Sequence, residues 1–167
     1  MKTFCRIILL LVIIPAFSYG QDTTVVKKQA QALANAELKG HYELVTAHTY
    51  PKLVLAVGGK EKMTATIKQA TEMLQSQGLT IESIVIGAPG KFYKAGTEIH
   101  CLVPERMVLV TGNGRLVNNS YMLAVSKDGG KFWYFLDINQ GTYKLIPNLF
   151  PNFNKKLVIP EPTQPGM

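Results

Sequence analysis

The chain has 167 residues, a formal net charge of +7 and two cysteines. Its lysines and arginines are scattered and form no arginine-rich face interleaved with aromatic residues, which argues against a nucleic-acid partner. One cysteine lies in the N-terminal leader, so Cys101 has no partner for an internal disulfide and stability must come from packing.

Residues 1–20 have the order of a secretory signal peptide. Lys2 and Arg6 give a positive start, residues 7–14 form an unbroken apolar run, and small residues lead up to Gly20. The run is too short to span a bilayer, which takes roughly 20 apolar residues. We therefore expect export to the periplasm or the exterior, with no integral membrane segment after cleavage.

The first half of the remaining chain is predicted to be helical. Apolar residues recur at helical spacing before Gly40 and again before Gly78, and either glycine can end a helix. The positions that define these two helices are Val26, Ala30 and Leu33, and then Met63, Ile67, Ala70 and Leu74. A short helix is expected between them over 41–49, with another turn over 52–57.

From Leu79 the apolar pattern changes to a period of two, which predicts strands. Asn113-Gly114 and Asp128-Gly129 are hairpin signals, so the sheet should be antiparallel. Pro104 cannot donate to a ladder and predicts a bulge or an edge at that point. The expected strands cover residues 81–86, 91–94, 97–111, 115–126 and 131–137.

The end of the chain is predicted to hold a short helix over 141–150, followed by a proline-rich tail that lies across the surface. The expected organisation is a signal peptide over 1–20, one α+β domain over 21–150, and the C-terminal tail over 151–167.

Three stretches resemble the nuclear-transport-factor-2-like superfamily: residues 34–40, Tyr50-Pro51 leading into Gly58-Gly59, and residues 126–137. The chain looks especially like small exported members of undefined function from Bacteroidetes-type bacteria. The resemblance implies a cystatin-like α+β cone, in which N-terminal helices pack in the concave face of a bent antiparallel sheet of about four strands. Relatives include ketosteroid-isomerase-like and dehydratase-like enzymes, ligand binders and protein-interaction modules, so the fold alone does not choose a function.

Two residues are candidates for acid–base catalysis in such a cone. Asp137 ends the last expected strand on the side of Trp133 and Phe135, and burial there would raise its pKa. His48, near the end of the second helix, could act as a base oriented by Asp137. Both also have a structural interpretation, since Asp137 could cap the following turn or pair with a lysine, and His48 could interact with the helix dipole.

The aromatic residues Tyr50, Tyr121 and Trp133 are candidates for lining a pocket that takes a small apolar ligand. Core packing is the alternative, and it is preferred for Trp133.

Neither a metal nor a cofactor is expected. The histidines and Cys101 have no close ligand spacing, and the sequence has no phosphate loop or dinucleotide fingerprint. His100 and Cys101 alternate on a strand and face opposite sides, which argues against a cysteine hydrolase.

The other face of the last strand is apolar, with Phe132, Tyr134 and Leu136. An antiparallel sheet usually has one wet face, so this face should be covered by a partner subunit or by the tail. Dimerisation of relatives through the outer sheet face makes a homodimer one expectation.

The leading hypothesis is an exported, non-enzymatic binding or interaction module, which could take a protein partner or hold a small apolar ligand in its pocket. The alternatives are an isomerase-like or dehydratase-like enzyme using Asp137 and His48, and a structural dimeric envelope protein.

Overall fold

A computed structural model describes residues 22–162, which form an α+β domain as expected. The helices are α1 (Thr23–Leu38), α2 (Tyr42–His48), α3 (Pro51–Val57), α4 (Lys60–Ser76) and α5 (Gln140–Leu149). The strands are β1 (Thr80–Ile86), β2 (Tyr93–Ala95), β3 (Glu98–Thr111), β4 (Gly114–Ser126) and β5 (Tyr134–Asp137). No helix within 22–162 is long and apolar enough to cross a membrane. The expected signal peptide lies outside the described residues.

Local signals explain where the helices begin and end. The Asp22 side chain accepts a hydrogen bond from the Thr24 amide and caps α1, and a glycine with positive φ, Gly40, follows its last turn. Pro51 occupies the first turn of α3, where its missing N–H costs nothing. Gly58 ends that helix in the left-handed conformation, which a side chain would strain.

All strand pairs are antiparallel, in the order β1-β3-β4-β5, and the short β2 pairs with the beginning of β3. The β3–β4 hairpin is the longest ladder and runs without interruption from the pair Ile99 and Ser126 to the pair Thr111 and Gly114. The hairpin turn predicted at Asn113-Gly114 is confirmed.

Pro104 lies at an edge and not at a bulge. It pairs with Tyr121 in an unbroken β3–β4 register, which excludes the bulge and leaves the edge of the two predicted alternatives. On its other side β1 has just ended, and the Pro104 carbonyl accepts from the Gly87 amide. In an antiparallel strand the backbone N–H and C=O of one residue point toward the same neighbouring strand. The N–H that Pro104 lacks would therefore point past the end of β1, where no strand residue needs it as a donor. The irregularity lies in β1, between Ile81 and Ser83.

The last strand begins later than the pattern predicted, at Tyr134 and not at Lys131. The Asp128 carboxylate accepts hydrogen bonds from the amides of Lys131 and Phe132, which holds both residues in the turn. A short acidic side chain commonly bonds the backbone in this way, and period-two hydrophobicity does not report it.

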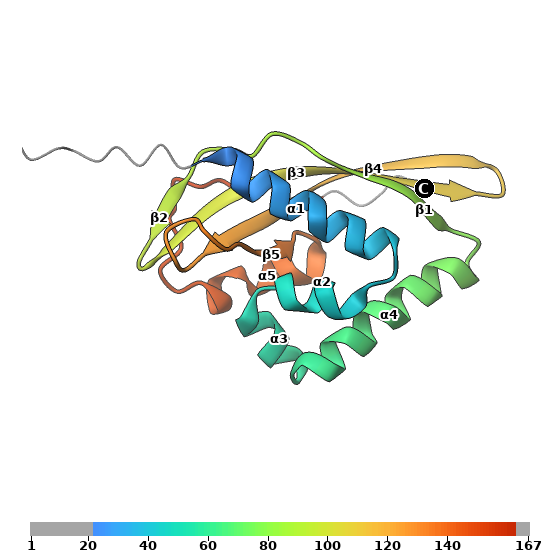
Figure 1. The fold of residues 1–167 in the computed structure, drawn as a ribbon, viewed down its shortest axis with the longest axis horizontal. Coiled ribbons are helices and arrows are strands. Elements are labelled where there is room, and N and C mark those ends of the chain that lie inside the picture. The colour runs from blue at the N-terminus through green and yellow to red at the C-terminus, as the bar shows by residue number, and fades with distance from the viewer. Residues whose placement is uncertain (1–21, 163–167) are drawn as a thin grey trace, which may run out of the picture.

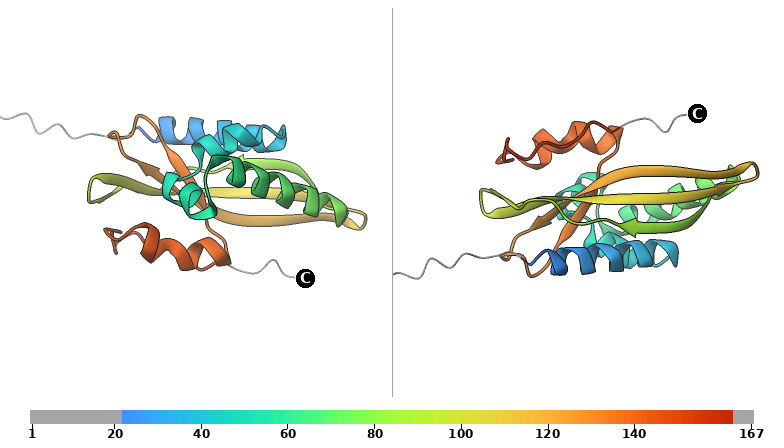
Figure 2. Two further views of the ribbon diagram at one scale, coloured as in Figure 1. Left: turned by 90° about the horizontal axis from the view of Figure 1, so that it is seen from below. Right: turned by 90° about the horizontal axis from the view of Figure 1, so that it is seen from above.

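The sheet has helices on both faces, with α1 on one side and α5 on the other (Figure 2). We call the face against α1 the inner face and the face against α5 the outer face. The inner cluster includes Val26, Ala30, Leu33, Val45, Ile84, Cys101, Val103, Trp133 and Phe135. The outer cluster includes Tyr50, Leu53, Leu123, Val125, Leu136, Ile146, Leu149, Phe150 and Leu157.

The apolar outer face is covered by the chain itself. Beyond α5, the segment 150–162, which we call the C-terminal strap, continues across this face, and Leu157 is buried in the outer cluster. The Asn154 side-chain amide donates to the Lys94 carbonyl at 2.9 Å, which ties the strap to β2. Of the two expected covers, the structure shows the tail, together with α5, packed on the outer face.

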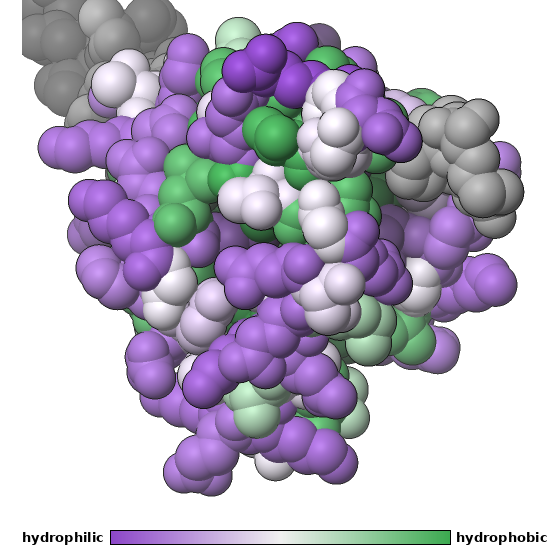
Figure 3. Space-filling view, turned by 90° about the vertical axis from the view of Figure 1, so that its right-hand side faces the viewer, coloured by the Kyte–Doolittle hydropathy of each residue, from purple (hydrophilic) through white to green (hydrophobic). Residues whose placement is uncertain are grey.

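The distal part of the outer face is not covered in this way. Val85, Val110 and Val117 are exposed there, on three neighbouring strands. On the side that carries the end of the β3–β4 hairpin, hydrophobic side chains show between hydrophilic ones (Figure 3). The homodimer stays a prediction.

Candidate functional site

A pocket of about 610 Å³ lies beside the free edge of β4, beyond the end of β5. Its walls come from α1, α2, β3, β4, β5, the start of α5 and the end of the C-terminal strap. Apolar side chains at the wall are Leu33, Val45, Met107 and Phe135. The volume is within the range of about 300–1,000 Å³ typical of small-molecule sites.

Four carboxyl groups line this pocket. Glu161 belongs to the end of the C-terminal strap, and the other three, Glu37, Glu105 and Asp137, come from α1, β3 and β5. Glu37 follows Leu33 by one helical turn of α1, so both lie on the same side of the helix. Glu105 lies between Val103 and Met107 on the inner face of β3, in register with Ser120. Asp137 lies two residues after Phe135 and therefore on the same face of β5.

The shared pocket raises the pKa of all three acids. Burial raises the pKa of Glu105 to about 8, and repulsion from Asp137 and then from Glu37 adds to this effect. Burial is also the main cause for Glu37, followed by repulsion from Asp137. Glu105 therefore holds its proton at a pH at which an ordinary glutamate is ionised, and the pKa values of Glu37 and Asp137 shift in the same direction.

Asp137 combines access with low hydration. It is an exposed residue that lines the pocket, and protein atoms nevertheless surround its carboxyl group closely enough to disfavour the charge. Burial raises its pKa, while hydrogen bonds from the Asn139 side chain, at 3.2 Å, and from the Ile138 amide act in the opposite direction. The Asp137 carboxyl thus lies next to the space that a ligand would occupy, with its pKa above the ordinary value.

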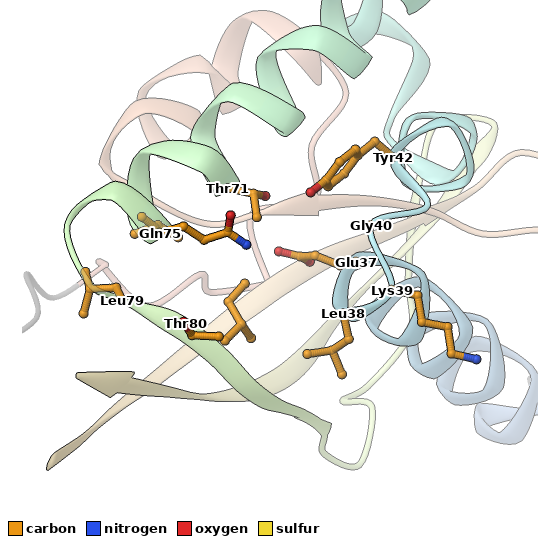
Figure 4. Close-up of a pocket in the computed structure, with 11 residues that line it drawn as sticks. Glu37, Leu38, Lys39, Gly40, Tyr42, Thr71, Gln75, Leu79 and Thr80 are labelled. Atoms are coloured by element: carbon orange, nitrogen blue, oxygen red, sulfur yellow. The ribbon is translucent and has the colours of Figure 1, made fainter. Parts of the chain in front are cut away.

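Glu37 also lines a second, smaller pocket of about 290 Å³ between the C-terminal ends of α1 and α4 and the start of β1. In Figure 4 its carboxyl group lies near the centre of this pocket, with Tyr42 and Thr71 to one side and Leu38 to the other. Glu37 therefore separates the two pockets and is accessible from both.

The structure places one of the two predicted catalytic residues in the large pocket. Asp137 is there, whereas His48 is not among the residues that line it. The His48 ring stacks on Phe132 with centroids 4.9 Å apart, and its Nδ1 lies 3.4 Å from the Trp133 carbonyl oxygen. Asp137 has Asn139 as its side-chain partner, so the structure does not bring the proposed acid–base pair together.

Of the three predicted ligand-binding aromatics, only Tyr121 lines this pocket. Trp133 is 1% exposed in the inner cluster, and its indole N–H donates to the Gly130 carbonyl. Tyr50 is completely buried in the outer cluster, and its hydroxyl donates to Glu98 at 3.0 Å. Both positions agree with the packing alternative.

Sequence reasoning missed Glu37 and Glu105. The signal for Glu105 was present, because it occupies an inward position between Val103 and Met107 in an otherwise apolar strand. A carboxyl at such a position is rarely buried without a reason. The signal for Glu37 was weaker, since acidic residues are common near a helix end.

The cysteine and the histidines do not form a reactive centre. Burial raises the pKa of the Cys101 thiol to about 12, so its thiolate form is scarce. His100 is buried on the opposite face of β3, as the alternation predicted. In the part of the chain that the structure describes, no group of three or more His, Cys, Asp or Glu side chains is arranged to hold a metal ion.

No protein-family model matches this chain, and no curated protein sequence matches it either. The site must therefore be interpreted from its own chemistry. It offers apolar walls, three closely coupled carboxyl groups, and side-chain amides from Asn118, Asn119 and Asn139.

Proposed function

We propose that the protein is an exported ligand-binding module of nuclear-transport-factor-2-like type, whose large pocket takes a small organic cation with an apolar body. The observation that supports this most directly is the convergence of Glu37, Glu105 and Asp137 on one pocket with apolar walls. The export part of the proposal rests on the residue order of 1–20.

A cation fits because of the charges already present. Repulsion among the three carboxyl groups contributes to the raised pKa of Glu105 and of Glu37. A ligand ammonium or amidinium group would replace this repulsion with attraction. Its positive charge would neutralise the carboxylates, as bound protons otherwise do. Leu33, Met107 and Phe135 would pack on the apolar part of the same ligand.

The proposal is tested with benzylammonium and its neutral analogue benzyl alcohol, using two-dimensional ¹H–¹⁵N NMR of residues 21–167. We expect benzylammonium to shift the amide signals of residues 118–122 and 139–141, which line the pocket. Benzyl alcohol should bind at least tenfold more weakly, because it lacks the charge.

The matched controls separate pocket binding from general attraction to acidic residues. Glu105→Gln combined with Asp137→Asn should weaken benzylammonium binding at least tenfold. Glu43→Gln, on the exposed surface of α2, should leave it unchanged. Equal affinity for the charged and neutral compounds, or shifts scattered over the surface, would contradict the proposal.

A second candidate function is proton transfer by Asp137, as in an isomerase or a dehydratase. It is favoured by the position of Asp137 at the pocket and by the raised pKa of its carboxyl, which suits a group that both takes up and releases a proton. Without His48 in the pocket, Glu105 is the neighbouring group that could exchange the proton.

This candidate is tested by following the conversion of an unconjugated cyclic enone to its conjugated isomer by absorbance. Turnover that falls by about a hundredfold or more in Asp137→Asn, and that persists in His48→Asn, would support it. Absence of turnover above that of free acetate would reject this substrate class and leave the binding function.

A further inference from the structure

His100 is buried beneath the C-terminal strap. Its side chain is completely inaccessible, and its ring lies against Phe150 and Phe153, with centroids 5.1 Å and 5.7 Å away. The Nε2 atom is 3.1 Å from a carboxylate oxygen of Glu98. Since a carboxylate accepts, the neutral ring carries its proton on Nε2 and leaves Nδ1 bare.

The bare Nδ1 atom is the only buried side-chain nitrogen or oxygen within residues 22–162 that lacks a hydrogen-bond partner. In the neutral ring this position is a lone pair surrounded by aromatic groups. In the charged ring it becomes an N–H donor that has no acceptor, which is an unfavourable arrangement for a buried group.

The charged neighbours of His100 do not offset this. Glu98 on β3 already accepts a hydrogen bond from the Tyr50 hydroxyl, and Lys127 after β4 lies 3.8 Å from it. Tyr93 on β2 is the strand partner of His100, and the strap contributes the uncharged rings of Phe150 and Phe153. Burial lowers the pKa of His100 more than the hydrogen bond and charge of Glu98 raise it.

We propose that the C-terminal strap is an acid-sensitive clasp, in which protonation of His100 favours a state with Phe150 and Phe153 displaced from the outer face of the sheet. In that state the new Nδ1–H reaches water. The same displacement removes Phe150 from the outer cluster, which includes Leu123 and Leu136, and withdraws the end of the strap from the large pocket, where Pro160 and Pro162 form part of the wall. This inference is independent of which ligand the pocket takes.

The test is hydrogen–deuterium exchange of residues 150–162 between pH 7.5 and 5.0, corrected for the intrinsic pH dependence of exchange. When the strap is displaced, His100 should titrate near its ordinary value of about 6.5. The protection of the strap should then fall by up to about tenfold for each pH unit below that value. Constant protection over this range would overturn the proposal.

His100→Gln keeps a side-chain donor for Glu98 and does not titrate, so its strap protection should be independent of pH over this range. His41→Gln changes an exposed histidine and should retain the full dependence. A dependence that persists in His100→Gln would overturn the proposal.

Two further readouts keep the test decisive. Protonation of the pocket carboxyls removes negative charge from the pocket that Glu161 of the strap also lines. It would therefore increase the protection of the strap at low pH, which is the opposite sign. If His100→Gln does not fold, long-range ¹H–¹⁵N spectra of the wild-type imidazole replace it. Proton uptake by His100 at the midpoint of strap release supports the clasp, and uptake without release overturns it.

Discussion

The two faces of the sheet bury acidic side chains in opposite ways. On the inner face, Glu37, Glu105 and Asp137 share a pocket and repel one another. On the outer face, Glu98 has Tyr50, His100 and Lys127 around it. The first arrangement leaves unsatisfied charge that a proton or a ligand can neutralise, whereas the second is a network whose carboxylate already has its partners.

Burial alone therefore does not mark a functional group. Both Glu98 and Glu105 lie on β3, and neither is freely exposed. What distinguishes them is the charge of the neighbouring side chains and the presence of a pocket. The two faces should therefore respond differently to mutation and to pH.

The largest effect is expected from pH on the inner face. Because folding raises the pKa of Glu105 to about 8, the folded state binds its proton more tightly than the unfolded state. Its contribution to stability is therefore complete below about pH 4.5 and is lost as the pH rises to 8. For Glu105 alone, the free energy of unfolding should fall by roughly 3.5 kcal/mol between pH 5 and pH 8.

Urea denaturation at several pH values measures this fall. Glu105→Gln should flatten the slope, and exposed Glu43→Gln should reproduce the wild type. Identical slopes in Glu105→Gln and the wild type would mean that the protonation of Glu105 is not coupled to folding.

Removal of the outer carboxylate should come next in size. Glu98→Ala leaves the Tyr50 hydroxyl and the His100 Nε2–H without their acceptor in a region from which water is largely excluded. We expect a loss of about 3 kcal/mol in the free energy of unfolding at pH 7.

The matched change on the surface is Glu82→Ala, which removes the carboxylate that Arg115 binds through two hydrogen bonds. Its effect should be much smaller, because exposed ion pairs contribute little. Comparable losses in the two variants would show that the outer network is not energetically distinct from a surface pair.

A smaller effect is expected for Tyr50→Phe, which removes one donor and keeps the ring that packs on Phe150 at 4.5 Å. The cost should be about 1.5 kcal/mol, the low end of the range for a hydrogen bond to a charged group, because the carboxylate retains other partners. Thermal unfolding of the two proteins measures it. If Tyr50→Phe lowered the free energy of unfolding as much as Glu98→Ala does, the stabilisation by this network would depend on the Tyr50 hydroxyl alone.

The smallest effect is expected for His48→Asn, because His48 lies beside the inner face but does not line the large pocket. The affinity for benzylammonium should change by less than about twofold. A tenfold loss would place His48 at the site after all, and would restore the pairing with Asp137 that the sequence suggested.

Much of the fold could be predicted because its signals are local. Helical spacing of Val26, Ala30 and Leu33 located α1, and Asn113-Gly114 located the hairpin between the two longest strands. The misses were also local but of another kind. Asp128 shortened the last strand through side-chain hydrogen bonds to the backbone, which hydrophobic periodicity does not report.

The candidate site was predicted only in part. Asp137 was identified from its place at the end of a strand and its side of that strand. Its companions Glu37 and Glu105 come from α1 and β3, and nothing in the spacing along the chain indicates that these elements meet there. His48 was paired with Asp137 by the position of its helix, and the structure turns it toward Phe132 instead.

The sequence by itself determined the α+β class, the order of the elements and the antiparallel pairing, because these depend on residue periodicity and on turn residues within a few positions. Only the tertiary structure decided that three acids share a pocket, that the chain covers its own outer face, and that His100 lies beneath that cover. Periodicity fixes which side of an element is buried. Which buried sides meet depends on contacts between residues far apart in the sequence, and those contacts set the pKa values and accessibility on which function depends.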